Sequence, residues 1–141
     1  MIVFKIERKG EVMVKKICFL ASIFYLIFVG CQKNEECISL KEAEDIVLYQ
    51  IVGADTMEWD TTKIRVCELP WMLEEGETVK SAENSYKIEK KCWFFFIDDY
   101  PTLRWIHPCR FVFVYCEGNY EVKNERWPPY THRDDMVEIS W

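Results

Sequence analysis

The chain has little of several features that would point to a common class of protein. Its 141 residues include only 5 glycines and 5 prolines, which excludes a collagen-like or linker-like chain. Basic residues number 18 against 24 acidic ones, and phosphate binding needs the opposite balance, so nucleic acid is disfavoured as a partner. A net charge of −6 is compatible with a basic protein partner. The 16% of aromatic residues supply enough apolar surface for one folded domain.

Sequence motifs for metal binding and for catalysis are also missing. The chain has two histidines, His107 and His132, and no Cys-x-x-Cys pair, so the spacing typical of zinc ligands does not occur. No motif places a nucleophile beside a base. A turn that ends a strand explains the carboxylate pair Asp98 and Asp99 more simply than calcium or acid–base chemistry does. We therefore expect a non-catalytic protein without a metal or other cofactor.

A short apolar run near the start of the chain predicts export to the cell envelope. Residues 17–29 are too few to span a bilayer as a helix, and they follow Lys15 and Lys16. A basic start, a short apolar core and a small residue at the cleavage site are typical of a secretory signal peptide. The sequence Phe28-Val29-Gly30-Cys31 resembles a bacterial lipobox, with Phe28 where Leu is usual. This resemblance implies lipidation of Cys31, which would become the first residue of the mature chain.

The charges on either side of this run divide the N-terminal part further. Residues 1–12 carry mixed charges that signal peptides lack, so we expect translation to start at Met13 and residues 1–12 to be a gene-start artefact. Residues 13–30 are then the signal peptide and residues 31–38 an acidic tether. Residues 32–36 resemble the short surface-export signal on lipoproteins of the Bacteroidetes phylum. That resemblance implies a lipid-anchored, surface-exposed protein of the outer membrane; the alternative is a solvated tether with no role in sorting.

Residues 39–141 are expected to form one α+β domain. Ser39 and Glu42 have the spacing of a capping box, and apolar residues at helical spacing follow, which predicts a helix over residues 40–52 with Gly53 as a left-handed cap. Alternating patterns then predict strands at 63–67, 85–89 and 120–123, and runs that are apolar on both faces predict central strands at 92–97 and 111–116. A hairpin turn is predicted at 118–119. The two prolines of residues 127–130 end sheet pairing. We expect one N-terminal helix packed on a small antiparallel meander, in two layers.

The strand patterns also resemble a known family. The sequence Trp-x-Phe-x-Ile at 93–97 precedes Arg-Phe-Val-Phe-Val-Tyr-x-x-Gly-x-Tyr-x-Val at 110–122, and together they resemble the PepSY-type layout, with Tyr115, Gly118 and Val122 in its final hairpin. The resemblance covers residues 39–123. It implies a helix on a small curved sheet and a non-catalytic domain like the propeptides of secreted peptidases. Small lipoproteins that resemble the propeptides of papain-like peptidases act as peptidase inhibitors.

Five cysteines remain after Cys18 leaves with the signal peptide and Cys31 is acylated. They are Cys37, Cys67, Cys92, Cys109 and Cys116. Cys109 and Cys116 lie about 23 Å apart along one predicted strand and cannot bridge each other, since a disulfide needs Cα atoms within about 7 Å. The candidate pairs are Cys92 with Cys109 or Cys116, and Cys37 with Cys67. The alternative is that most are buried free thiols packed as small apolar residues.

The long loop at residues 98–108, between two rigid strands, is the expected contact surface. Its residues, with two aromatic side chains near the prolines, make the predicted site: Tyr100, Arg104, Trp105, His107, Trp127 and Tyr130. Exposed aromatics at a loop end form binding surfaces; the alternative is that they cap the open end of the sheet.

Three functions are compatible with this surface. The leading hypothesis is an envelope-anchored lipoprotein that binds a protein partner, in its sharpest form a propeptide-like peptidase inhibitor. The rival hypothesis is a carbohydrate-binding accessory lipoprotein, in which Trp105 and Trp127 would stack on sugar rings. The third is a structural component of the envelope.

Overall fold

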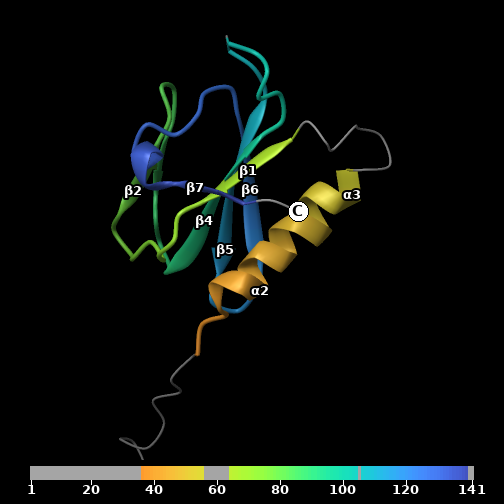
Figure 1. Cartoon of the computed structure of the whole chain (residues 1–141). Helices are drawn as coiled ribbons and strands as arrows, with labels where there is room; N and C mark the ends of the chain where they lie inside the picture. Colours follow the sequence, from red (N-terminus) through yellow and green to blue (C-terminus); the bar gives the residue numbers. More distant parts are fainter. Residues whose placement is uncertain (1–35, 56–63, 105, 140–141) are drawn as a thin grey trace, which may run out of the picture. The chain divides into compact units, whose positions relative to one another are not determined.

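The computed structural model in Figure 1 describes residues 36–55, 64–104 and 106–139. All of them belong to one compact unit, residues 35–141. The predicted signal peptide and Cys31 lie outside the described residues. Among the residues that are described, no helix is long and apolar enough to cross a membrane.

The helix begins where the capping box predicts it. The Ser39 hydroxyl accepts a hydrogen bond from the Glu42 amide at 3.3 Å, and the Ser39 amide donates to the Glu42 carboxylate at 2.8 Å. The helix runs through α2 (Leu40–Asp45), the π-helical η1 (Ile46–Val52) and α3 (Gly53–Asp55). The expected left-handed cap at Gly53 is wrong: its φ is −63°, and its amide donates to the Leu48 carbonyl, so the helix continues through it. The expectation that this is the N-terminal helix of the chain concerns residues 1–35, which lie outside the described residues.

A five-stranded antiparallel sheet forms the centre of the unit, in the order β6-β5-β4-β1-β7. Its strands are β1 (Arg65–Glu68), β4 (Cys92–Asp98), β5 (Cys109–Tyr115), β6 (Tyr120–Glu125) and β7 (Val137–Ile139). The meander β4-β5-β6 agrees with the sequence pattern. The expectation that sheet pairing ends at residues 127–130 is wrong, because the chain returns after the prolines and β7 pairs with β1, placing Ile139 opposite Val66.

Both faces of the sheet are covered, so the expected arrangement in two layers is also wrong. One face packs against the helix, with Val47, Val52, Phe95 and Val112 among the buried residues. The other face is covered by a second, two-stranded sheet of β2 (Thr78–Lys80) and β3 (Ser85–Lys87) and by neighbouring loops. This second cover follows from β4 and β5, which are apolar on both faces and cannot leave either one in water. The α+β class is confirmed.

Candidate functional site

A cavity of about 790 Å³ lies at the end of the sheet where β4 ends and β5 begins. Its volume is within the range of small-molecule and peptide-side-chain sites. The residues that line it come from β1, β4, the β4–β5 loop and the segment between β6 and β7. They are Arg65, Cys67, Phe96, Asp98, Pro101, Leu103, Arg104, Ile106, His107, Arg126, Trp127, Pro128, Pro129, Arg133 and Met136.

Strand register explains why segments distant in sequence meet here. Asp98 is opposite Cys109, and Cys109 is opposite Glu125, so the loop after β4 and the segment after β6 leave the sheet at the same end. The latter segment then passes β2, where the Tyr130 amide donates to the Lys80 carbonyl at 3.1 Å, before it reaches β7 at the opposite edge. A rigid sheet therefore holds both walls of the cavity.

The structure brings three of the six predicted site residues into this cavity: Arg104, His107 and Trp127. Tyr100 is half-buried in the same loop, but it is not a lining residue. Tyr130 is 59% exposed and also lies outside the lining. Trp105 is outside the described residues.

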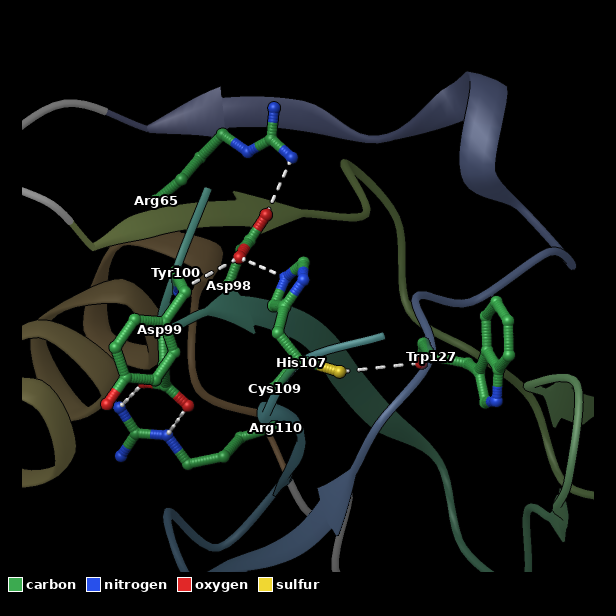
Figure 2. Close-up of polar contacts among 8 residues, drawn as sticks. All are labelled: Arg65, Asp98, Asp99, Tyr100, His107, Cys109, Arg110 and Trp127. Atoms are coloured by element: carbon green, nitrogen blue, oxygen red, sulfur yellow. Dashed lines mark hydrogen bonds and ion pairs between the residues drawn. The ribbon is translucent and has the colours of Figure 1, made fainter. Parts of the chain in front are cut away.

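Asp98 is the polar anchor of the cavity (Figure 2). Its side chain is almost fully buried, and it accepts from Arg65 Nη2 at 2.8 Å and from the Tyr100 amide at 3.1 Å. His107 Nε2 lies 2.8 Å from Asp98 Oδ1, the same oxygen that accepts from the Tyr100 amide, while Arg65 binds Oδ2. One carboxylate therefore fixes β1, the start of the loop and its histidine together, which compensates its removal from water.

The second carboxylate of the pair holds the far end of the loop. Asp99 accepts two hydrogen bonds from Arg110, at 2.6 Å from Nη2 and 3.2 Å from Nε (Figure 2). This two-point contact is the geometry that a planar guanidinium favours. The adjacent acids thus stabilise a strand end and its loop, in line with the turn interpretation.

Arginine dominates the rest of the lining. Four of the six arginines of the chain line the cavity, Arg65, Arg104, Arg126 and Arg133, and none of the described lysines does. Among the described residues, the guanidinium groups of Arg104, Arg126 and Arg133 have no hydrogen-bond or ion-pair partner. Of these four arginines, the sequence analysis placed only Arg104 in the predicted site. A signal for two of the others was available in the sequence: Arg126 and Arg133, like Arg104, lie outside the strands in segments that contain Trp and Pro.

The cysteines form one disulfide that differs from every expected pair, and three of the five are free thiols, two of them buried, as the alternative expected. Cys37 is joined to Cys116, with Cα atoms 4.1 Å apart, and Cys67, Cys92 and Cys109 are free thiols. The expected pairs Cys37–Cys67, Cys92–Cys109 and Cys92–Cys116 are therefore wrong. The physical reason is that Cys116 follows β5 directly and reaches the start of the helix, where the Ile38 amide donates to its carbonyl at 3.2 Å.

The free thiols near the cavity are poorly suited to nucleophilic chemistry. Cys67 lines the cavity, and burial raises the pKa of its thiol, although Arg65 opposes the shift. Burial raises the pKa of Cys109 to about 12, and its thiol donates to the Trp127 carbonyl at 3.4 Å. A thiol acts as a nucleophile through its thiolate, which a raised pKa disfavours.

The guanidinium groups of the lining are suited to binding a group with negatively charged oxygen atoms. The described residues contain no cluster of three or more His, Cys, Asp or Glu side chains that would hold a metal ion. What they contain is a walled cavity with several guanidinium donors at its rim. No protein family, curated protein or solved structure was found to match the chain.

Proposed function

We propose that this chain is a non-catalytic lipoprotein of the cell envelope, anchored through lipidated Cys31, whose folded domain binds a protein partner. The observation that carries the binding role is the cavity of about 790 Å³ at the sheet end. It is preformed, because strand register and the two aspartate contacts hold its walls. A preformed concave site with guanidinium and apolar lining lowers the entropic cost of binding.

The sharper version of the proposal is a propeptide-like peptidase inhibitor. Its support is the PepSY-type pattern of β4, β5 and β6 together with a helix packed on an antiparallel sheet. The outer strand β7 and the second sheet of β2 and β3 are additions to the expected layout. A partner would contact the loop at residues 99–108 and the segment at 126–136.

Capture from membranes tests the binding role. The lipidated chain, cross-linked in intact cells, should retain a protein that the Ile106→Asp variant loses, since Ile106 lines the cavity and is 41% exposed. Tyr49→Asp is the control, because Tyr49 is an even more exposed large side chain, at 72%, on the helix and outside the cavity. Equal capture by both variants would contradict the proposal, and a peptidase among the captured proteins would favour the inhibitor version.

The anchor and the rival function have their own measurements. The intact mass of the protein extracted from membranes should correspond to a chain that starts at an acylated Cys31; an unacylated chain that retains Met1 would remove the envelope proposal. The carbohydrate-binding alternative is favoured by the presence of Trp127 in the lining, although its indole N–H already donates to Glu83 at 3.1 Å. Glycan-array binding that is lost in Trp127→Ala would support that alternative, and no ligand in either assay would favour a structural component.

A further inference from the structure

The cavity has a charge opposite to that of the chain. The whole chain carries a net charge of −6, yet the described residues that line the cavity include four arginines and a single acid, Asp98. That acid is already satisfied by Arg65, His107 and the Tyr100 amide. Asp134 and Asp135 are beside Arg133 in the short η3 (Arg133–Asp135), but neither lines the cavity. The charged side chains among the described lining residues therefore sum to a net positive charge.

The choice of arginine over lysine indicates the geometry of the ligand. The described part of the chain contains six lysines, and none of them lines the cavity. A guanidinium presents a rigid fork of donors that matches the two oxygens of a carboxylate, whereas an ammonium acts as a compact point charge. Arg104 comes from the β4–β5 loop, while Arg126 and Arg133 come from the segment after β6, so they reach the cavity from different walls.

Apolar side chains share the lining with these donors. Pro101, Leu103 and Ile106 come from the β4–β5 loop, and Pro128 and Met136 come from the segment after β6. The lining therefore combines anion-binding groups with surfaces that would cover aliphatic side chains. A neutral sugar has a poorer match, because its hydroxyl groups need acceptors as well as donors and the only carboxylate of the lining is occupied.

We propose that the cavity binds an acidic peptide segment of the partner protein, with carboxylates held by Arg104, Arg126 and Arg133 and aliphatic side chains placed between them. This assignment rests on the proposed function, because it names the part of the partner that is recognised. It makes the arginines the determinants of specificity and the apolar residues the source of complementarity.

Fluorescence anisotropy with defined probes tests the assignment. The probe is a labelled, terminally blocked peptide of alternating Glu and Leu, and its Gln and Leu counterpart has the same shape without the charge. We expect the acidic peptide to bind at least about tenfold more tightly than the neutral one, and binding to weaken as ionic strength rises. Inorganic phosphate and polygalacturonate serve as competitors that carry anionic groups without a peptide.

Two double variants with the same change in net charge locate the site. Arg104→Gln with Arg126→Gln should weaken binding of the acidic peptide at least about tenfold. Lys87→Gln with Lys90→Gln should leave it unchanged, since both lysines are exposed and outside this cavity. Thermal unfolding checks that each variant folds, and Arg104 and Arg126 are exposed side chains without partners among the described residues.

Each result decides the proposal. Equal binding of the two peptides, equal loss in the two double variants, or no binding would overturn it. Competition by phosphate as strong as that by unlabelled acidic peptide would indicate a simple anion site, and tighter binding of polygalacturonate would indicate an acidic glycan; both would overturn the peptide assignment.

If the membrane capture succeeds while the acidic peptide fails, the proposed function stands without this ligand class. If the peptide binds while capture fails, the site stands and the protein-binding role does not.

Discussion

Loss of the Cys37–Cys116 disulfide should remove a large part of the stability of the folded unit. The bond joins residues 79 apart in sequence. In the chain-entropy model, a closed loop of that length contributes about 4.5 kcal/mol at 25 °C by restricting the unfolded chain. Domains of this size have total unfolding free energies of about 5–15 kcal/mol. We therefore expect reduction to lower the melting temperature by roughly 15 °C or more without abolishing the fold.

The contacts around the bond explain why the reduced protein should retain its native arrangement. The Ile38 amide donates to the Cys116 carbonyl, and the Trp93 indole donates to the Ile38 carbonyl at 2.9 Å. These hydrogen bonds keep the start of the helix on the β5–β6 hairpin after the sulfurs separate. The loss of stability should therefore come from the freed unfolded chain rather than from a changed fold.

Urea unfolding followed by tryptophan fluorescence measures the effect in a chain that starts at residue 32. Wild type is compared with and without reductant, and with the double variant Cys37→Ser, Cys116→Ser. Cys67→Ser is the control, because it removes a thiol that is already free. Wild type and Cys67→Ser should both be destabilised by reductant, whereas the double variant should not respond to it. Alkylation of the denatured protein should modify three cysteines before reduction and five after it.

Two results would refute the reasoning. A double variant that still loses stability on reduction would show that another pair of cysteines forms the bond. A stability change below about 1 kcal/mol in wild type would show that the unfolded chain is not restricted as the loop-closure estimate requires. Peptide mapping of the unreduced protein separates the two cases, since it identifies the linked cysteines directly.

Three further predictions concern single side chains. Burial raises the pKa of Glu68 to about 7, so the folded protein holds a proton that the unfolded chain releases near pH 4.5. The stabilisation from this proton is complete below pH 4.5 and is lost as pH rises through 7, which should lower the free energy of unfolding by up to about 3 kcal/mol. A pH series of urea unfolding measures the decrease, and Glu68→Gln should abolish it. Asp98→Asn should cost about 2–3 kcal/mol by calorimetry, less than a fully buried pair, because Arg65 is 43% exposed while His107 is mostly covered. Ser39→Ala should cost about 1 kcal/mol in the same assay by removing the helix cap.

Local features of the fold were predictable from the sequence. The capping box at Ser39 and Glu42 depends on residues three apart, and the structure confirms it. The central strands β4 and β5 were predicted from short continuous apolar runs, which are typical of strands buried on both faces. Their adjacency follows from the short meander that continues into β6. In each case, nearby residues contain the information that decides the structure.

Features that depend on distant segments were not predictable. The strand β7 has three residues and a weak pattern, and it forms only because β1 offers an unpaired edge about 70 residues earlier. The Cys37–Cys116 bond likewise depends on where the β5–β6 hairpin meets the start of the helix. At Gly53, a glycine after an apolar helical run favours a cap, but π-helical hydrogen bonding carries the helix through it.

The proposed acidic partner illustrates why the net charge of a chain can differ in sign from the charge of a binding site. The excess of acids suggested a basic partner, but charges on an exposed surface are screened over about 8 Å at physiological ionic strength. A ligand inside the cavity therefore interacts mainly with the groups that line it, and these are arginines and one satisfied aspartate. Arg104, Arg126 and Arg133 lie in segments that no strand pattern connects, so only the sheet register brings them together. The same acidic exterior can then act as a filter, because it repels anions except where the arginines face the solvent.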